Sequence, residues 1–529
     1  MKHAVPTFFI TFMPTDRQPT YLDLFAGCGG LSLGFRHAGF KPLLAVDIDP
    51  KAVATYNFNF DEGSSGAVQA DLAALKTHGD VAVFLTKYDI GEGDCDVLVG
   101  GPPCQSFSTV GRTKVRALME GDERMRERWE QRNALRTSLF EAYVLFLEYL
   151  QPRWFLFENV PAIRSHDAFV RIQERFANLR TTSGRQLSYG ITAENYWASD
   201  YGVPQHRRRF LMVGHRTDVG IAAWARPVRA VGPSVREALD DLPSVASGHK
   251  QRQIPHVTAP VSEYQVLMRC EPAGNSCKFV YNHVGRTHNA DDVELFRRMA
   301  PGAKFSDPEV QAALPDINPN HKLLKYSVEK FQDKLHKLDP SRPSWTVTAH
   351  LQKDCYKFIH YEAARTITVR EAARLQSFPD WFVFPDAMAP AYRLIGNAIP
   401  PLLAKAFAES FHASDPGLRC GFERLRAVFP DHQWSLVLSA IGGATKRATF
   451  GRRLRQVLAG GKLVMSDNLS WSDAARILGV GNSQRLQRRL GIVRRLGIWA
   501  AANAAGWGIP EAEPAPWREV EHVGDLAAD

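Results

Sequence analysis

The strongest constraint on the fold comes from an apolar run that ends in a cysteine held by two prolines. Residues 96–99 (DVLV) have the pattern of a buried strand, and residues 101–108 (GPPCQSFS) follow it. Proline fixes its own φ, so Cys104 is predicted on a rigid mount just past the strand end. A second strand-like run, residues 153–157, ends at Glu158. Neighbouring parallel strands present their carboxyl ends to one crevice, so a thiol and a carboxyl group are predicted to face one substrate.

Short apolar runs alternate with amphipathic segments from Tyr21 to about Gly214. This alternation predicts an α/β fold with a mostly parallel sheet and helices on both of its faces. Regular patterning weakens after residue 214 and returns at residues 345–348. The predicted strands are residues 22–25, 43–46, 96–99, 153–157 and 209–214, and the predicted helices are 31–38, 137–150, 369–375 and 399–411.

Composition limits the class of protein. The chain has 529 residues, 45% of them hydrophobic, and no run approaches the ~20 apolar residues of a membrane span. The net charge of +9 is compatible with a polyanionic partner. Seven scattered cysteines without a CxxC pair favour a reducing compartment, so we expect a cytoplasmic protein. No metal is predicted, because Cys270, Cys277, His283 and His288 lack a common zinc spacing.

A glycine turn at residues 23–31 (DLFAGCGGL) joins a predicted strand to a helix start. Glycines let the backbone approach a ligand, and the helix N-terminus offers free N–H groups. Alone, the turn is compatible with NAD, FAD or S-adenosylmethionine. Asp47 ends the next strand, where a carboxylate can bind ribose hydroxyls, and Asp71 follows a third candidate strand and could meet an adenine amino group. The alternative for each carboxylate is a helix cap.

The ordered series of motifs resembles the DNA (cytosine-5)-methyltransferase family. The resemblance covers residues 20–411 and rests on the number and order of the motifs. The corresponding segments are residues 25–30 (FAGCGG) for the cofactor loop, 101–108 for the nucleophile loop, 158–160 (ENV) for the acidic motif, 205–209 (QHRRR) for QxRxR, and 370–379 (REAARLQSFP) and 396–401 (GNAIPP) for the two closing motifs.

The resemblance implies a Rossmann-like methyltransferase fold, S-adenosylmethionine as cofactor and methylation of C5 in a cytosine. Cytosine C5 is a poor nucleophile, so it needs a thiolate at C6, and Cys104 is the expected nucleophile. Glu158 is expected to supply a proton at N3 if burial raises its pKa. Arg209, and with it Arg207, is expected near the cytosine O2 and the catalytic loop; the alternative is a phosphate contact or an ion pair. Asn159 is expected to support the local backbone. The target must leave the duplex to reach these groups.

Cofactor contacts are expected from three parts of the chain: the glycine turn, the ends of the next two strands, and the segments around the nucleophile and the last motif. We expect no metal among them. The expected cofactor-binding residues are Phe25, Ala26, Gly27, Gly29, Gly30, Leu31, Asp47, Ile48, Asp71, Pro103, Asn397 and Ala398.

Changes in patterning and composition also divide the chain, and its C-terminal part lies outside the resemblance. The basic segment 111–136 is expected either to close over bound DNA or to form a solvated helix, and residues 470–480 suggest a helix-turn-helix. Expected partners of a monomer are double-stranded DNA and, in a restriction system, an endonuclease acting on the same site. The predicted domains are a flexible extension (1–19), a catalytic and cofactor-binding domain (20–214), a target-recognition domain (215–340), a closing part of the catalytic domain (341–412), a helical basic accessory domain (413–507) and a disordered tail (508–529).

Three alternatives stay open on sequence alone. An RNA cytosine methyltransferase would share the chemistry, although the long segment between the arginine motif and Trp345 favours a duplex-reading enzyme. A silent DNA-binding regulator would have no physical need for Cys104, Glu158 and Arg209 together. A nicotinamide oxidoreductase fits only the glycine turn.

Overall fold

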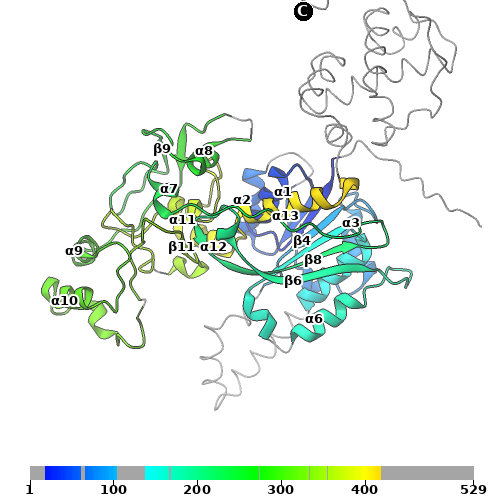
Figure 1. The fold of residues 1–529 in the computed structure, drawn as a ribbon, viewed down its shortest axis with the longest axis horizontal. Helices are drawn as coiled ribbons and strands as arrows, with labels where there is room; N and C mark the ends of the chain where they lie inside the picture. Colours follow the sequence, from blue (N-terminus) through cyan, green and yellow to red (C-terminus); the bar gives the residue numbers. More distant parts are fainter. Residues whose placement is uncertain are drawn as a thin grey trace, which may run out of the picture. The chain divides into compact units, whose positions relative to one another are not determined.

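The computed structural model describes residues 18–60, 66–103, 138–165, 168–272, 275–332, 334–353 and 355–418. Within these, Pro19–Ser414 form one compact unit (Figure 1). Cys104, the basic segment 111–136 and the candidate helix-turn-helix lie outside the described residues, so the expectations for them stay predictions. The proposed domain boundaries within the compact unit also stay predictions.

A seven-stranded sheet in the order β3-β2-β1-β4-β5-β8-β6 forms the centre of the unit. The first five strands in this order pair in parallel, whereas β8 is antiparallel to both β5 and β6. Strands β1 and β4 are buried along their whole length, which explains their nearly continuous apolar sequences. The strands are β1 (Thr20–Leu24), β2 (Lys41–Asp47), β3 (Ala67–Gln69), β4 (Val97–Gly100), β5 (Trp154–Asn159), β6 (Tyr189–Trp197) and β8 (Arg208–Arg216).

Helices cover both faces of the sheet, as predicted. On one face, Phe35 of α1 (Gly30–His37) packs against Tyr21, and Phe411 of α13 (Pro401–Ser414) stacks on Trp154. On the other face, helical residues 138–150 and α6 (Ala168–Ala177) pack against β5 through aromatic contacts. Two further helices are α2 (Pro50–Asn59) and α3 (His78–Thr86). The mostly parallel α/β fold is therefore confirmed.

The carboxyl ends of the parallel strands lie at one edge of this sheet, and the residues of the candidate site follow them. Because β1, β2, β4 and β5 are parallel, their carboxyl ends reach the same edge, followed by Phe25, Ile48, Gly101 and Val160. Strand β8 runs the other way, with Glu158 opposite Leu211. The first residues of β8 therefore lie at that same edge.

The region after β8 consists of short elements joined by long connections, which agrees with its weak sequence periodicity. A two-residue strand, β11 (Ser344–Trp345), returns to pair with β7 (Gln205–His206). No described helix is long and apolar enough to cross a membrane. The remaining regular elements are α7 (Val235–Leu239), β9 (Gln253–Pro255), α8 (Glu263–Arg269), β10 (Phe279–Tyr281), α9 (Ala290–Arg298), α10 (Pro308–Ile317), α11 (Val369–Leu375) and α12 (Met388–Asn397).

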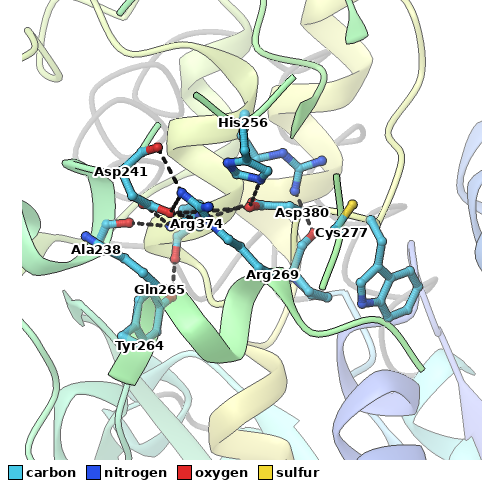
Figure 2. Close-up of polar contacts among 12 residues, drawn as sticks. Ala238, Asp241, His256, Tyr264, Gln265, Arg269, Cys277, Arg374 and Asp380 are labelled. Carbon is cyan, nitrogen blue, oxygen red and sulfur yellow. Dashed lines mark hydrogen bonds and ion pairs between the residues drawn. The ribbon is translucent and has the colours of Figure 1, made fainter. Parts of the chain in front are cut away.

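A buried ionic network joins α11 to the segments around α7 and α8. Figure 2 shows the Arg374 guanidinium between the carboxylates of Asp241 and Asp380. The Arg269 guanidinium also donates a hydrogen bond to Asp241, from Nε to Oδ2. His256 Nε2 lies 3.1 Å from Asp380 Oδ2. Arg374, Asp241 and Asp380 have no exposed side-chain surface, so each charge depends on the others for compensation.

Replacing Arg374 by methionine is expected to lower the free energy of unfolding by about 3–5 kcal/mol, because it leaves Asp241 and Asp380 buried with fewer partners. The measurement is urea-induced unfolding near pH 7. The control is Arg236→Met, whose half-exposed guanidinium pairs with Asp240 and Glu362 and whose loss should change stability by at most about 1 kcal/mol. Equal effects of the two variants would show that the network adds no stability.

Candidate active site

The turn between β1 and α1 has an unusual backbone. Phe25, Gly27 and Gly29 all have positive φ, at 61°, 57° and 94°. A Cβ on Gly29 would lie 2.4 Å from the Phe60 ring, so only glycine fits there. Phe25 keeps a conformation that is costly for a residue with a side chain, a kind of strain that gathers at functional sites.

The turn is fastened to the end of β2. The Gly27 amide donates to Asp47 Oδ2 at 2.8 Å, and the Asp49 amide donates to Asp47 Oδ1 at 2.8 Å. Burial raises the pKa of Asp47, and these two amides act against that rise. Ile48, the next residue, is 61% exposed beside this carboxylate. No described atom would lie within 4 Å of a Cβ on Gly27, so the space beyond the turn is open.

The last motif lies against the start of α1. A Cβ on Gly30 would be 2.2 Å from the carbonyl oxygen of Ile399 and 3.3 Å from Ala398 Cβ. Leu31 is buried, whereas Asn397 is exposed at the end of α12. The structure therefore brings Ala398 to the glycine turn, from more than 360 residues further along the chain.

Asp71 acts as a cap. It precedes the short 3-10 helix Leu72–Ala74, and its side chain accepts a hydrogen bond from the Ala73 amide at 2.9 Å. This is the alternative that the sequence left open for it. A contact of Asp71 with an adenine stays a prediction.

Asp23, inside β1, is a polar residue of this region that sequence reasoning passed over. Its Oδ2 accepts from Ser32 Oγ at 2.6 Å, and Tyr56 donates to the same hydroxyl at 3.0 Å. Burial raises the pKa of Asp23 to about 7, and the hydrogen bond from Ser32 acts against the rise. A carboxylate inside an otherwise apolar strand was the available signal. It links β1 to the first turn of α1.

The acidic motif meets the proline segment directly. A Cβ on Gly101 would lie 2.5 Å from Glu158 Oε2, so this backbone lies against the carboxyl group. Asn159 donates from Nδ2 to the carbonyl oxygen of Pro102 at 3.2 Å, which confirms its expected role in supporting the backbone. Pro103 is exposed at the end of the described segment. The structure thus places Glu158 beside the residues that lead into Cys104.

The two motif arginines have different partners. Arg209 Nε lies 2.9 Å from Glu158 Oε1, and both side chains are largely buried. Arg207 is fully buried and donates to the carbonyl oxygens of Val347 and Gly396, at 2.5 and 2.8 Å. Arg209 thus pairs with the acid, whereas Arg207 binds backbone oxygens that include one of the last motif. The expected position of both arginines near the cytosine O2 stays a prediction.

The environment of Glu158 favours its protonated form. Burial raises the pKa of this carboxyl group, and the charges of Arg209 and Arg207 oppose the rise without cancelling it. A carboxylic acid that keeps its proton to a higher pH than usual can donate that proton to a ring nitrogen.

Comparison with known proteins decides the family. The family model of C-5 cytosine-specific DNA methylases matches residues 20–413, which contain the whole edge described above. The chain belongs to this family. It is therefore a DNA (cytosine-5)-methyltransferase, and the predicted fold class and enzyme class are both confirmed.

Several methyltransferases resemble the chain over about three quarters of its length. The type II methyltransferase M.AgeI of Thalassovita gelatinovora is 32% identical, covering 74% of this chain and 98% of its own. M.DdeI of Desulfomicrobium norvegicum is 32% identical, covering 73% and 87%. A crystal structure from E. coli, described as a DNA modification methyltransferase encoded within a prophage, has a TM-score of 0.54 and 25% identity, covering 75% and 99%.

Proposed function

We propose that this chain transfers a methyl group from S-adenosylmethionine to C5 of a cytosine in a specific double-stranded DNA sequence. The observation that supports this most is the Glu158 carboxyl group, held between Gly101 and Arg209 with a raised pKa. Because relatives of the chain are type II methyltransferases, the expected partner is an endonuclease with the same sequence specificity.

The residues of the first sheet strands fit the cofactor. The open space at Gly27, the Asp47 carboxylate and the exposed Ile48 side chain offer a cradle, hydrogen-bond acceptors and an apolar contact within one turn. Ribose hydroxyls are suitable donors to Asp47, and an adenine ring is a suitable partner for Ile48. S-adenosylmethionine, when bound there, supplies an electrophilic methyl group.

The chain's own residues then activate the cytosine. The Cys104 thiolate adds to C6 and forms a covalent bond, while Glu158 donates its proton to N3 so that no charge builds up on the ring. The electron pair displaced to C5 makes that carbon nucleophilic enough to take the methyl group. When a base removes the C5 proton, the C6–sulfur bond breaks and Cys104 is released as a thiolate. The N3 proton returns to Glu158, which leaves neutral 5-methylcytosine and restores the acid.

Arg209 is placed to assist this proton transfer. Its guanidinium pairs with Glu158 and stands at the same edge, where it can donate to the cytosine O2 and stabilise charge in the transition state. We assign Arg207 a positioning role, since its donors hold Val347 and Gly396. A base inside a duplex cannot reach this enclosed acid, so the target cytosine is extruded.

The test is methyl transfer from labelled S-adenosylmethionine to duplex DNA and, separately, to tRNA. We expect label in DNA only, and sequencing of 5-methylcytosine should place it at one recurring sequence. Incorporation into RNA alone would contradict the proposed substrate while leaving the chemistry intact.

A further inference from the structure

An exposed tryptophan and an arginine lie together at the edge that carries Glu158. Trp197 is the last residue of β6 and pairs in register with Arg208, the first residue of β8. Arg208 Cζ lies 5.6 Å from the centroid of the Trp197 ring. The indole is 44% exposed although it is large and apolar. His206 is also exposed and meets the indole edge-on, at 6.3 Å between centroids.

Among the described residues, Arg208 differs from the arginines around it because its guanidinium has no acceptor. Arg209 pairs with Glu158, Arg207 donates to two carbonyl oxygens, and Arg226 pairs with Glu194. In the part of the chain that the structure describes, no carboxylate or carbonyl oxygen accepts from the Arg208 guanidinium. The indole contributes about 0.5–1 kcal/mol of cation–π attraction at an exposed site, which orients the guanidinium without neutralising it.

The backbone of Arg208 connects this pair to the reactive groups. Its carbonyl oxygen accepts from Arg209 Nη1 at 2.9 Å, and Arg209 in turn holds Glu158. Successive residues of a strand point to opposite faces, about 3.3 Å apart along the chain. Arg208 and Trp197 therefore lie at the same edge as Glu158, on the face of the sheet opposite Arg209 and Glu158.

We propose that Arg208, oriented by the Trp197 ring, binds a backbone phosphate of the substrate DNA. A guanidinium matches the geometry of a phosphate and bonds it strongly, and phosphate contacts fix the register of a protein on a duplex. The proposal rests on the proposed function. It adds a contact that carries no sequence information and fixes the DNA at the sheet edge where Glu158 lies.

The test is the salt dependence of duplex binding by the full chain, measured between 50 and 200 mM KCl without methyl transfer. Arg208→Ala should lower the slope of log Kd against log salt by about one, because one fewer counterion is released. Trp197→Ala should raise Kd by about two- to fivefold, and Trp197→Phe should restore most of the affinity. Affinity for S-adenosylmethionine should stay unchanged in all three variants.

Arg226→Ala is the matched control, because Arg226 also lies over an indole, 5.7 Å from Trp224, but already pairs with Glu194. Its slope should equal that of the unmodified chain. An unchanged slope in Arg208→Ala, with the cofactor still bound, would overturn the phosphate contact and leave the methyltransferase function standing. A lowered slope in a chain that transfers no methyl group would support the contact and count against the proposed function.

Discussion

Replacing Cys104 by serine is expected to reduce methyl transfer to the level of a reaction without enzyme, with duplex affinity unchanged. A free cysteine has a pKa near 8.5, so a few per cent is thiolate at neutral pH, whereas a serine hydroxyl supplies essentially no alkoxide. The measurement pairs methyl incorporation with a DNA-binding assay on the same preparation.

Cys270→Ser is the matched control, since Cys270 is an exposed thiol in the region after β8. It should keep full activity. If Cys104→Ser were as active as Cys270→Ser, the nucleophile would have to be another group.

Replacing Glu158 by glutamine is expected to lower kcat by about 10²- to 10⁴-fold, the usual contribution of a general acid. The amide keeps the size of the carboxyl group and can still accept from Arg209, but it has no acidic proton. Single-turnover methyl transfer separates this loss from any change in binding. Glu194→Gln, on the exposed part of β6, should leave kcat unchanged.

The pH profile gives a second test of the same residue. Because Glu158 acts in its protonated form, kcat/KM of the unmodified chain should fall on the alkaline side, where that proton is lost. The fall should be absent from the residual activity of Glu158→Gln. An alkaline limb that persists unchanged in this variant would assign the proton to another group.

Stability should change with pH in the matching direction. The folded-state pKa of Glu158 is raised, so the folded chain holds this proton more tightly than the unfolded chain. The stability that this provides is present below the ordinary pKa of glutamate and is lost as pH rises through the raised value. Relative to Glu158→Gln, the unmodified chain should therefore become less stable over that range.

Much of the site was predictable because its main residues, Cys104 and Glu158, come at or just after the ends of strand-like apolar runs. The runs before Cys104 and after Trp154 are apolar on both faces, so the sequence places their ends well. The helix at 369–375 was also predictable. Thr368 and Glu371 form a capping box there, a local signal that does not depend on the rest of the fold.

Other features depend on contacts that sequence spacing does not reveal. The direction of β8 decides that Arg209 reaches Glu158, and an apolar run alone carries no direction. Arg207 and Arg209 look alike in the sequence, but one faces the interior and the other faces the acid. The last helix begins at Pro401 rather than at residue 399, as suits a proline in a first turn. The partners of Arg374 are likewise far away in the sequence.

The most direct measurement uses duplex DNA with 5-fluorocytosine at the target position. A base cannot remove fluorine from C5 as it removes the C5 proton, so the final elimination is blocked. A chain that attacks C6 should therefore stay covalently bound to its substrate after methylation. We expect a denaturant-resistant complex that needs S-adenosylmethionine, maps to the peptide containing Cys104 and disappears in Cys104→Ser. No such complex from a preparation that methylates ordinary DNA would contradict it.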